Sequence, residues 1–184
     1  RSPSRGLGDV YKRQIQHLKK IDIYENSIIV LWGDHGWQLG EHNLWAKHCN
    51  YQTSLKVPLL IKYPEQKKQK RINTVVELLD IYPTLCDLSN IKKPKHLQGK
   101  SLLSINNSDP ENLYGYSKYH RGNTVTSIDK SYTEWRNKDN NFKADMMYDL
   151  LKDPNENTNI SNNIENYTKI NKFQYLLDSI RNLD

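Results

Sequence analysis

Apolar residues first gather in the run Ser27–Trp32, which lies between polar Glu25-Asn26 and Gly33. A short run rich in isoleucine that ends at a glycine predicts a buried strand of a parallel sheet. Before it, Ile15–Tyr24 carries apolar residues at helical spacing, and after it Val57–Tyr63 forms a second apolar run. Helix followed by buried strands predicts an α/β fold.

The stretch between residues 41 and 88 contains less regular patterns. Glu41–Ser54, which separates the two predicted strands, is expected to be a long loop that lines a pocket. In Val75–Leu88 the apolar residues recur at spacings of three and four, interrupted by Pro83. Because proline is tolerated in the first turn of a helix, we predict an extended segment over Val75–Leu79 and then a helix whose first turn contains Pro83.

Beyond Asp109-Pro110 the pattern changes to short aromatic and β-branched runs with polar breaks, which is typical of antiparallel strands. These predicted strands are Leu113–Lys118, Thr124–Ile128, Tyr132–Trp135 and Met146–Leu150. Asp153–Glu156 reads as a turn, and Ile164–Leu183 repeats apolar residues at the spacing of an amphipathic helix. A small antiparallel sheet covered by one terminal helix is therefore expected.

The segment with the most chemistry is Gly33–Lys47, which reads G-D-H-G-W-Q-L-G-E-H-N-L-W-A-K. Asp34 and His35 follow the first predicted strand, and ligands of open α/β sheets bind beyond the carboxyl ends of the strands. A carboxylate and an imidazole can bind one metal ion, and Gly33 and Gly36 let the backbone turn tightly. The same pair can instead cap a turn or a helix, but the density of aromatic, histidine and glycine residues favours a site.

The segment Ser27–Lys62 resembles the second signature region of the type I sulfatases, which belong to the alkaline phosphatase superfamily. It is particularly similar to the iduronate-2-sulfatase-like branch, through G-D-H-G-W-x-L-G-E-H-x-x-W-A-K and on to Val57–Ile61. The resemblance implies the C-terminal part of a sulfatase/alkaline-phosphatase-like α/β sheet over residues 15–108. It also implies a small antiparallel α+β subdomain over residues 109–184.

The resemblance also implies roles for four side chains. Asp34 and His35 correspond to ligands of a divalent cation, usually Ca²⁺; Lys47 contacts the sulfate and its leaving-group oxygen, and Trp37 forms a wall of the substrate pocket. These residue types suit the chemistry, because a cation and a lysine both stabilise the negative charge that develops on a sulfate ester. From the residues alone, Asp34 and His35 would suit zinc or manganese equally well.

Part of such a site is absent from this chain. The sulfatase nucleophile is a formylglycine made from the cysteine of C-x-P-x-R, whereas Cys49 begins C-N-Y-Q-T and Cys86 begins C-D-L-S-N. The early paired aspartates of the family are absent too, and Ca²⁺ takes roughly six to eight oxygen ligands. The chain is therefore expected to be a C-terminal fragment that is inactive by itself, with the formylglycine in a preceding N-terminal half.

The hydrophobic content is 36% and the mean hydropathy is −0.87. Both values are low for a chain that buries a full hydrophobic core, so the composition agrees with a partial domain. Arg1–Gln14 shows no apolar periodicity and matches nothing in the family, so it is expected to be an artefactual leader or an ordinary flexible tail. It supplies +3 of the net charge of +6. No motif indicates nucleic-acid binding, and no apolar stretch has transmembrane length. The sequence leaves localisation open; family analogy implies a periplasmic, secreted or lysosome-like protein.

The expected function is hydrolysis of sulfate esters, and by family analogy the substrate is a sulfated carbohydrate. One alternative is a phosphomonoesterase or phosphodiesterase of the same superfamily, and another is a non-catalytic paralogue. Four further residues, His42, His48, His120 and Arg121, can either touch substrate or lie on the surface or behind the site. Cys49 can be a reactive thiol or a structural one.

Overall fold

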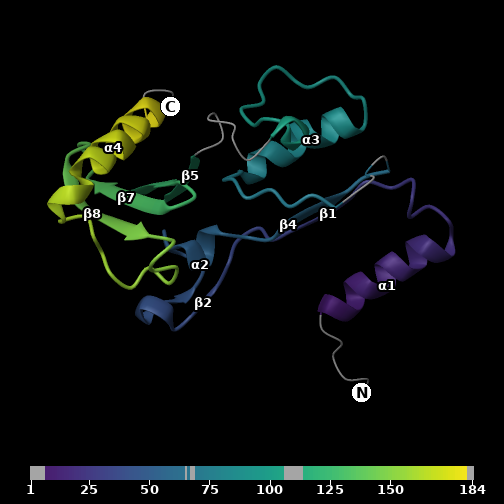
Figure 1. Ribbon diagram of the computed structural model, residues 1–184, viewed down its shortest axis with the longest axis horizontal. Coiled ribbons are helices and arrows are strands. Elements are labelled where there is room, and N and C mark those ends of the chain that lie inside the picture. Colours follow the sequence, from purple (N-terminus) through teal and green to yellow (C-terminus); the bar gives the residue numbers. More distant parts are fainter. Residues whose placement is uncertain (1–6, 65, 67–68, 106–113, 182–184) are drawn as a thin grey trace. The chain divides into compact units, whose positions relative to one another are not determined.

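The computed structural model describes residues 7–64, 66, 69–105 and 114–181. Two compact units make up the chain: unit 1 contains residues 1–32 and 58–70, and unit 2 contains residues 33–57 and 71–184. Figure 1 shows their elements in the colours of the sequence. Among the described residues, no helix is long and apolar enough to cross a membrane.

Unit 1 consists of one helix and two strands. Helix α1 spans Leu7–Lys20, and strands β1 and β4 span Ile29–Trp32 and Leu59–Lys62. The predicted order of helix and strand is confirmed. The helix starts earlier than predicted, at Leu7 instead of Ile15.

The prediction of a buried parallel strand is wrong in this structure. β1 pairs antiparallel with β4, with Ile29 opposite Lys62 and Trp32 opposite Leu59. Leu31 is 39% exposed and Trp32 is 52% exposed. An apolar run shows which residues avoid water, but it carries no information on the direction of the partner strand.

Unit 2 begins with the segment that follows β1. Its elements are β2 (Gln38–Leu39), the 3₁₀ turn η1 (Glu41–Asn43), β3 (Trp45–Ala46) and α2 (Gln52–Leu55). The expected long loop is thus a short hairpin followed by a single helical turn.

The next elements are η2 (Leu78–Asp80), α3 (Ile81–Leu88) and η3 (Leu102–Ser104). Pro83 is the third residue of α3, which confirms the predicted helix start, whereas Leu78 and Leu79, predicted to be extended, belong to η2.

The remainder of unit 2 is a four-stranded antiparallel sheet in the order β5-β6-β7-β8. Its strands are β5 (Gly115–Tyr119), β6 (Gly122–Thr126), β7 (Lys130–Arg136) and β8 (Phe142–Asp149). The 3₁₀ turn η5 (Ile164–Asn166) and helix α4 (Tyr167–Arg181) follow. The predicted antiparallel sheet and terminal helix are confirmed. The predicted strand start at Leu113 and the boundary at residues 108 and 109 lie outside the described residues.

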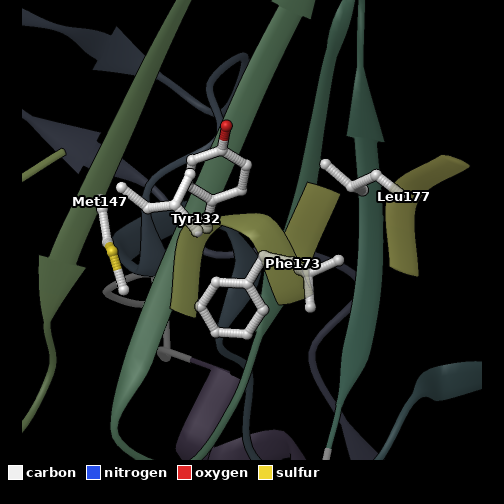
Figure 2. Close-up of a cluster of buried hydrophobic side chains, with 6 residues drawn as sticks. Tyr132, Met147, Phe173 and Leu177 are labelled. Atoms are coloured by element: carbon white, nitrogen blue, oxygen red, sulfur yellow. The ribbon is translucent and has the colours of Figure 1, made fainter. Parts of the chain in front are cut away.

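One face of this sheet is covered by α4 (Figure 1). The core between them contains Val125, Tyr132, Met147, Ile170, Phe173 and Leu177. Figure 2 shows Tyr132 and Phe173 within this cluster. Their ring centroids are 6.0 Å apart. Side chains on one face of β6, β7 and β8 therefore pack on the apolar stripe of the helix. This shared core holds the sheet and α4 together.

Candidate active site

His35 has a defined orientation because its two ring nitrogens face different groups. Nδ1 lies 2.7 Å from the Gly36 carbonyl oxygen, which can only accept, so Nδ1 carries the proton. Nε2 then presents its lone pair. Lys47 Nζ lies 2.9 Å from this nitrogen, and Asp34 Oδ2 lies 3.4 Å from it. The structure thus brings three of the four residues singled out in the sequence to one point.

The geometry of Asp34 and His35 fits a single cation. Two ligands about 2.4 Å from one ion and at right angles to each other lie roughly 3.4 Å apart. Asp34 Oδ2 and His35 Nε2 are 3.4 Å apart. Lys47 and a cation would need the same Nε2 lone pair, so only one of them can use it at a time. Among the described residues, no cluster of three or more histidine, cysteine, aspartate or glutamate side chains that could hold a metal ion is present.

Trp37, the fourth singled-out residue, lies beside this cluster. Its ring centroid is 6.1 Å from that of His35, and the side chain is 53% exposed. In the adjoining hairpin Gln38 pairs with Ala46 and Leu39 pairs with Trp45. Gln38 is buried whereas Trp45 is 72% exposed, so the hairpin presents an apolar outer face. Trp45 is an exposed aromatic that sequence reasoning assigned no role.

The turn that carries His35 packs directly on α2. Gly36 N–H donates to the Ser54 carbonyl oxygen at 2.8 Å. An added Cβ at Gly36 would lie 1.8 Å from the Thr53 carbonyl oxygen, so only glycine fits. Close backbone approach, and not an unusual φ angle, is therefore the reason for this glycine.

Cys49 holds the same region together from inside. Its Sγ accepts a hydrogen bond from Gln38 Nε2 at 3.1 Å and lies 3.0 Å from Ser54 Oγ. The side chain is 8% exposed. These contacts support the structural role of Cys49 rather than the reactive one.

The segment before α2 is anchored to the sheet by polar side chains. Asn50 Nδ2 donates to the Gly122 carbonyl oxygen at 3.3 Å and to Thr124 Oγ1 at 3.0 Å. The Glu156 carboxylate accepts from the backbone N–H of Gln52 at 2.6 Å. Sequence reasoning missed Glu156, which it treated as part of a turn. Glutamates are mostly exposed, so the sequence carries no signal that this one is buried.

The additional histidines have packing partners in the structure. His42 Nε2 lies 3.0 Å from the Asn155 carbonyl oxygen, and its ring stacks on Tyr51 with centroids 3.8 Å apart. His48 stacks on Tyr119 with centroids 5.5 Å apart. His42 and His48 therefore contribute to the fold, which agrees with the structural alternative left open for them.

Comparison with known proteins places this geometry in context. The family model described as N-sulphoglucosamine sulphohydrolase, C-terminal, matches residues 40–182. A protein named sulfatase from Formosa agariphila is 34% identical over 168 residues, which are 90% of this chain and 32% of that protein. Arylsulfatase K of Canis lupus familiaris is 32% identical in an alignment of 185 positions that covers 94% of this chain and 33% of that protein.

A solved structure described as a 2-O GAG sulfatase superposes with a TM-score of 0.75 at 26% identity. The superposition covers 90% of this chain and 38% of the other chain. This chain thus spans about a third of the length of the curated relatives it matches. Lys47 lies within the residues that the family model matches, whereas Asp34, His35 and Trp37 precede them.

Proposed function

Because the chain belongs to the N-sulphoglucosamine sulphohydrolase C-terminal family, we propose that it forms the carboxy-terminal part of a sulfuric ester hydrolase. The observation that carries the proposal is the convergence of Asp34 Oδ2 and Lys47 Nζ on His35 Nε2. A negative oxygen, a neutral nitrogen and an ammonium at one point suit an anionic ester and its counter-cation. Similarity to proteins named as sulfatases supports the same choice.

In this proposal Asp34 and His35 hold a divalent cation, which we take to be Ca²⁺. When bound, the cation supplies Lewis-acid stabilisation of sulfate oxygens. The Nδ1–H bond to Gly36 fixes the neutral imidazole tautomer, so that Nε2 is available as a ligand. The rest of the ligand set and a formylglycine nucleophile would come from sequence outside these 184 residues. The chain alone would then be inactive.

Lys47 supplies positive charge on the substrate side. Its ammonium is a compact charge with three donors on a flexible stem, and the side chain is exposed. It is therefore free to turn from His35 to a sulfate oxygen and to donate a proton toward the departing alcohol as the S–O bond breaks. Trp37 forms an apolar wall beside these polar groups.

We propose a sulfated carbohydrate as the substrate. The name of the similar 2-O GAG sulfatase supports this class, and the exposed Trp37 and Trp45 offer flat apolar surfaces to a sugar ring. The run G-D-H-G-W-Q-L-G-E-H-N-L-W-A-K over Gly33–Lys47 supports the iduronate-2-sulfatase-like branch.

The test is hydrolysis of sulfated saccharides and of matched phosphate esters by the intact protein, with Lys47→Ala and Lys143→Ala compared. Lys143 is an exposed lysine on β8 and serves as the control. We expect sulfate-ester hydrolysis that Lys47→Ala lowers by about a hundredfold, with an unchanged melting temperature, because a donor to the developing charge is lost. Lys143→Ala should match the parent.

Equal activity of Lys47→Ala and parent would remove Lys47 from the mechanism. Hydrolysis of phosphate esters alone would overturn the sulfatase assignment in favour of a phosphatase of the same superfamily. Absence of both activities would overturn it in favour of a non-catalytic paralogue.

A further inference from the structure

We propose that Glu156 is a positioning residue of the candidate site: its buried carboxylate fixes α2, and α2 in turn fixes the turn that carries His35. The importance of this position for catalysis rests on the proposed function. The contacts themselves are independent of it.

The Glu156 carboxylate joins the sheet to α2. Its Oε1 accepts a hydrogen bond from Ser131 Oγ on β7 at 2.7 Å, and its Oε2 accepts from the Gln52 backbone N–H at 2.6 Å. The side chain is 1% exposed, and this burial raises the pKa of the carboxyl group. Burying a carboxylate is costly unless both oxygens are hydrogen-bonded. Here each oxygen has a donor, and each donor belongs to a different element.

From α2 the contacts continue to the imidazole. The Ser54 carbonyl oxygen accepts the Gly36 N–H at 2.8 Å, and the Gly36 carbonyl oxygen accepts His35 Nδ1–H at 2.7 Å. The backbone of Gly36 is so close to Thr53 that no Cβ would fit between them. A displacement of α2 therefore displaces the Gly36 carbonyl, and with it the direction of the Nε2 lone pair.

The same turn also holds the hairpin that leads to Lys47. His42 Nε2 lies 3.1 Å from the Glu156 carbonyl oxygen, and His42 belongs to η1, between β2 and β3. Glu156 adopts a φ of 55°, in the left-handed region that is uncommon for a residue with a side chain. The Glu156 carboxylate thus contacts α2, on which the His35 turn packs, and the Glu156 carbonyl contacts the hairpin that precedes Lys47.

The test compares Glu156→Asn, Glu156→Gln and Ser131→Ala in the intact protein. Asparagine tolerates left-handed φ but is too short to reach α2, so the turn is preserved while the contact is lost. Glutamine keeps one acceptor oxygen for the Gln52 N–H. Ser131→Ala removes the other hydrogen bond of the same carboxylate and leaves the α2 contact in place.

We expect Glu156→Asn to lower kcat by at least about tenfold, as substitutions behind a metal ligand do, while KM changes by less than about twofold. It should also accelerate hydrogen–deuterium exchange in the peptide Gly33–Leu39, because the Gly36 N–H loses its fixed acceptor. Glu156→Gln should restore most of kcat. Ser131→Ala, which loosens the carboxylate but leaves its α2 contact in place, should lower kcat less than Glu156→Asn does.

Parental kcat and parental exchange in Glu156→Asn would overturn the proposal. A loss of kcat in Ser131→Ala as large as that in Glu156→Asn would also overturn it, since the effect would then not depend on the contact with α2. A parent without sulfatase activity would refute the proposed function instead, and exchange of the Gly33–Leu39 peptide would still decide whether Glu156 positions this turn.

Discussion

The Gly36 residue shows how one backbone position decides the orientation of the candidate site. Its carbonyl oxygen accepts a hydrogen bond from His35 Nδ1–H, and its N–H donates to the Ser54 carbonyl oxygen. The bond to Ser54 holds the backbone against α2, at a distance that leaves no room for a Cβ. The tautomer of His35 therefore depends on a residue that has no side chain.

Gly36→Ala is accordingly expected to destabilise unit 2 and to displace His35. A methyl group 1.8 Å from the Thr53 carbonyl oxygen forces backbone to move against backbone. We expect the free energy of unfolding to fall by about 1–3 kcal/mol, measured by denaturant titration. Gly8→Ala, where the added Cβ would meet nothing within 4 Å, should not destabilise the protein. A Gly36→Ala variant as stable as the parent would show that this packing is absent.

At the same scale, the sequence predicted Asp34, His35, Trp37 and Lys47 as site residues from one motif, and the structure brings the first two and Lys47 together. His35 and Lys47 are 12 positions apart in the sequence, and the β2–β3 hairpin brings them together. The sequence predicted only a loop there. Glu156 could not be predicted, because its role arises from contacts with residues far away in sequence.

At the scale of elements, charged and apolar contacts together hold α4 on the sheet. Asp129, in the turn between β6 and β7, accepts hydrogen bonds from Ser127 Oγ at 2.7 Å and from Lys169 Nζ of α4 at 2.6 Å. Burial alone would raise the pKa of the Asp129 carboxyl, but the hydrogen bonds from Lys169 and Ser127 outweigh it and lower the pKa to about 2. Ionised Asp129 therefore stabilises the folded state.

This shift predicts a pH dependence. The folded pKa of Asp129 lies below the unfolded value, so its contribution is complete above pH 3.8 and is lost as the pH falls toward 2. Asp129→Asn should reduce the fall in the free energy of unfolding between these pH values, measured by urea titration at several pH values. Asp139→Asn, at an exposed position, is the control. Identical pH profiles for parent and Asp129→Asn would contradict this assignment.

The hydrophobic pattern of the sequence predicted the helices and strands better than it predicted the direction in which the strands pair. Alternation and helical spacing predicted the antiparallel sheet and α4, because each element buries one face. The direction of β1 was predicted wrongly. Its run of apolar residues agrees equally with a parallel or an antiparallel partner, and β4 proved to be antiparallel.

At the scale of the whole molecule, the chain spans about a third of the length of its curated relatives. Under the proposed function, Asp34 and His35 would supply two of the roughly six to eight ligands that Ca²⁺ takes. What this part contributes is a rigid base: the sheet and α4 support α2, and α2 supports the turn with His35. The composition of the sequence indicated a partial domain. The anchoring of the His35 turn to the sheet through α2 could be seen only in the structure.

The most direct test of the account is cation binding by the intact protein, measured by equilibrium dialysis together with sulfate-ester hydrolysis before and after chelation. The parent should bind a divalent cation, lose hydrolysis on chelation and regain it when Ca²⁺ is returned. A variant with both Asp34→Ala and His35→Ala should lose binding and hydrolysis, whereas Lys47→Ala should lose hydrolysis and keep the cation. Cation binding by the double variant that equals the parent's would contradict the account.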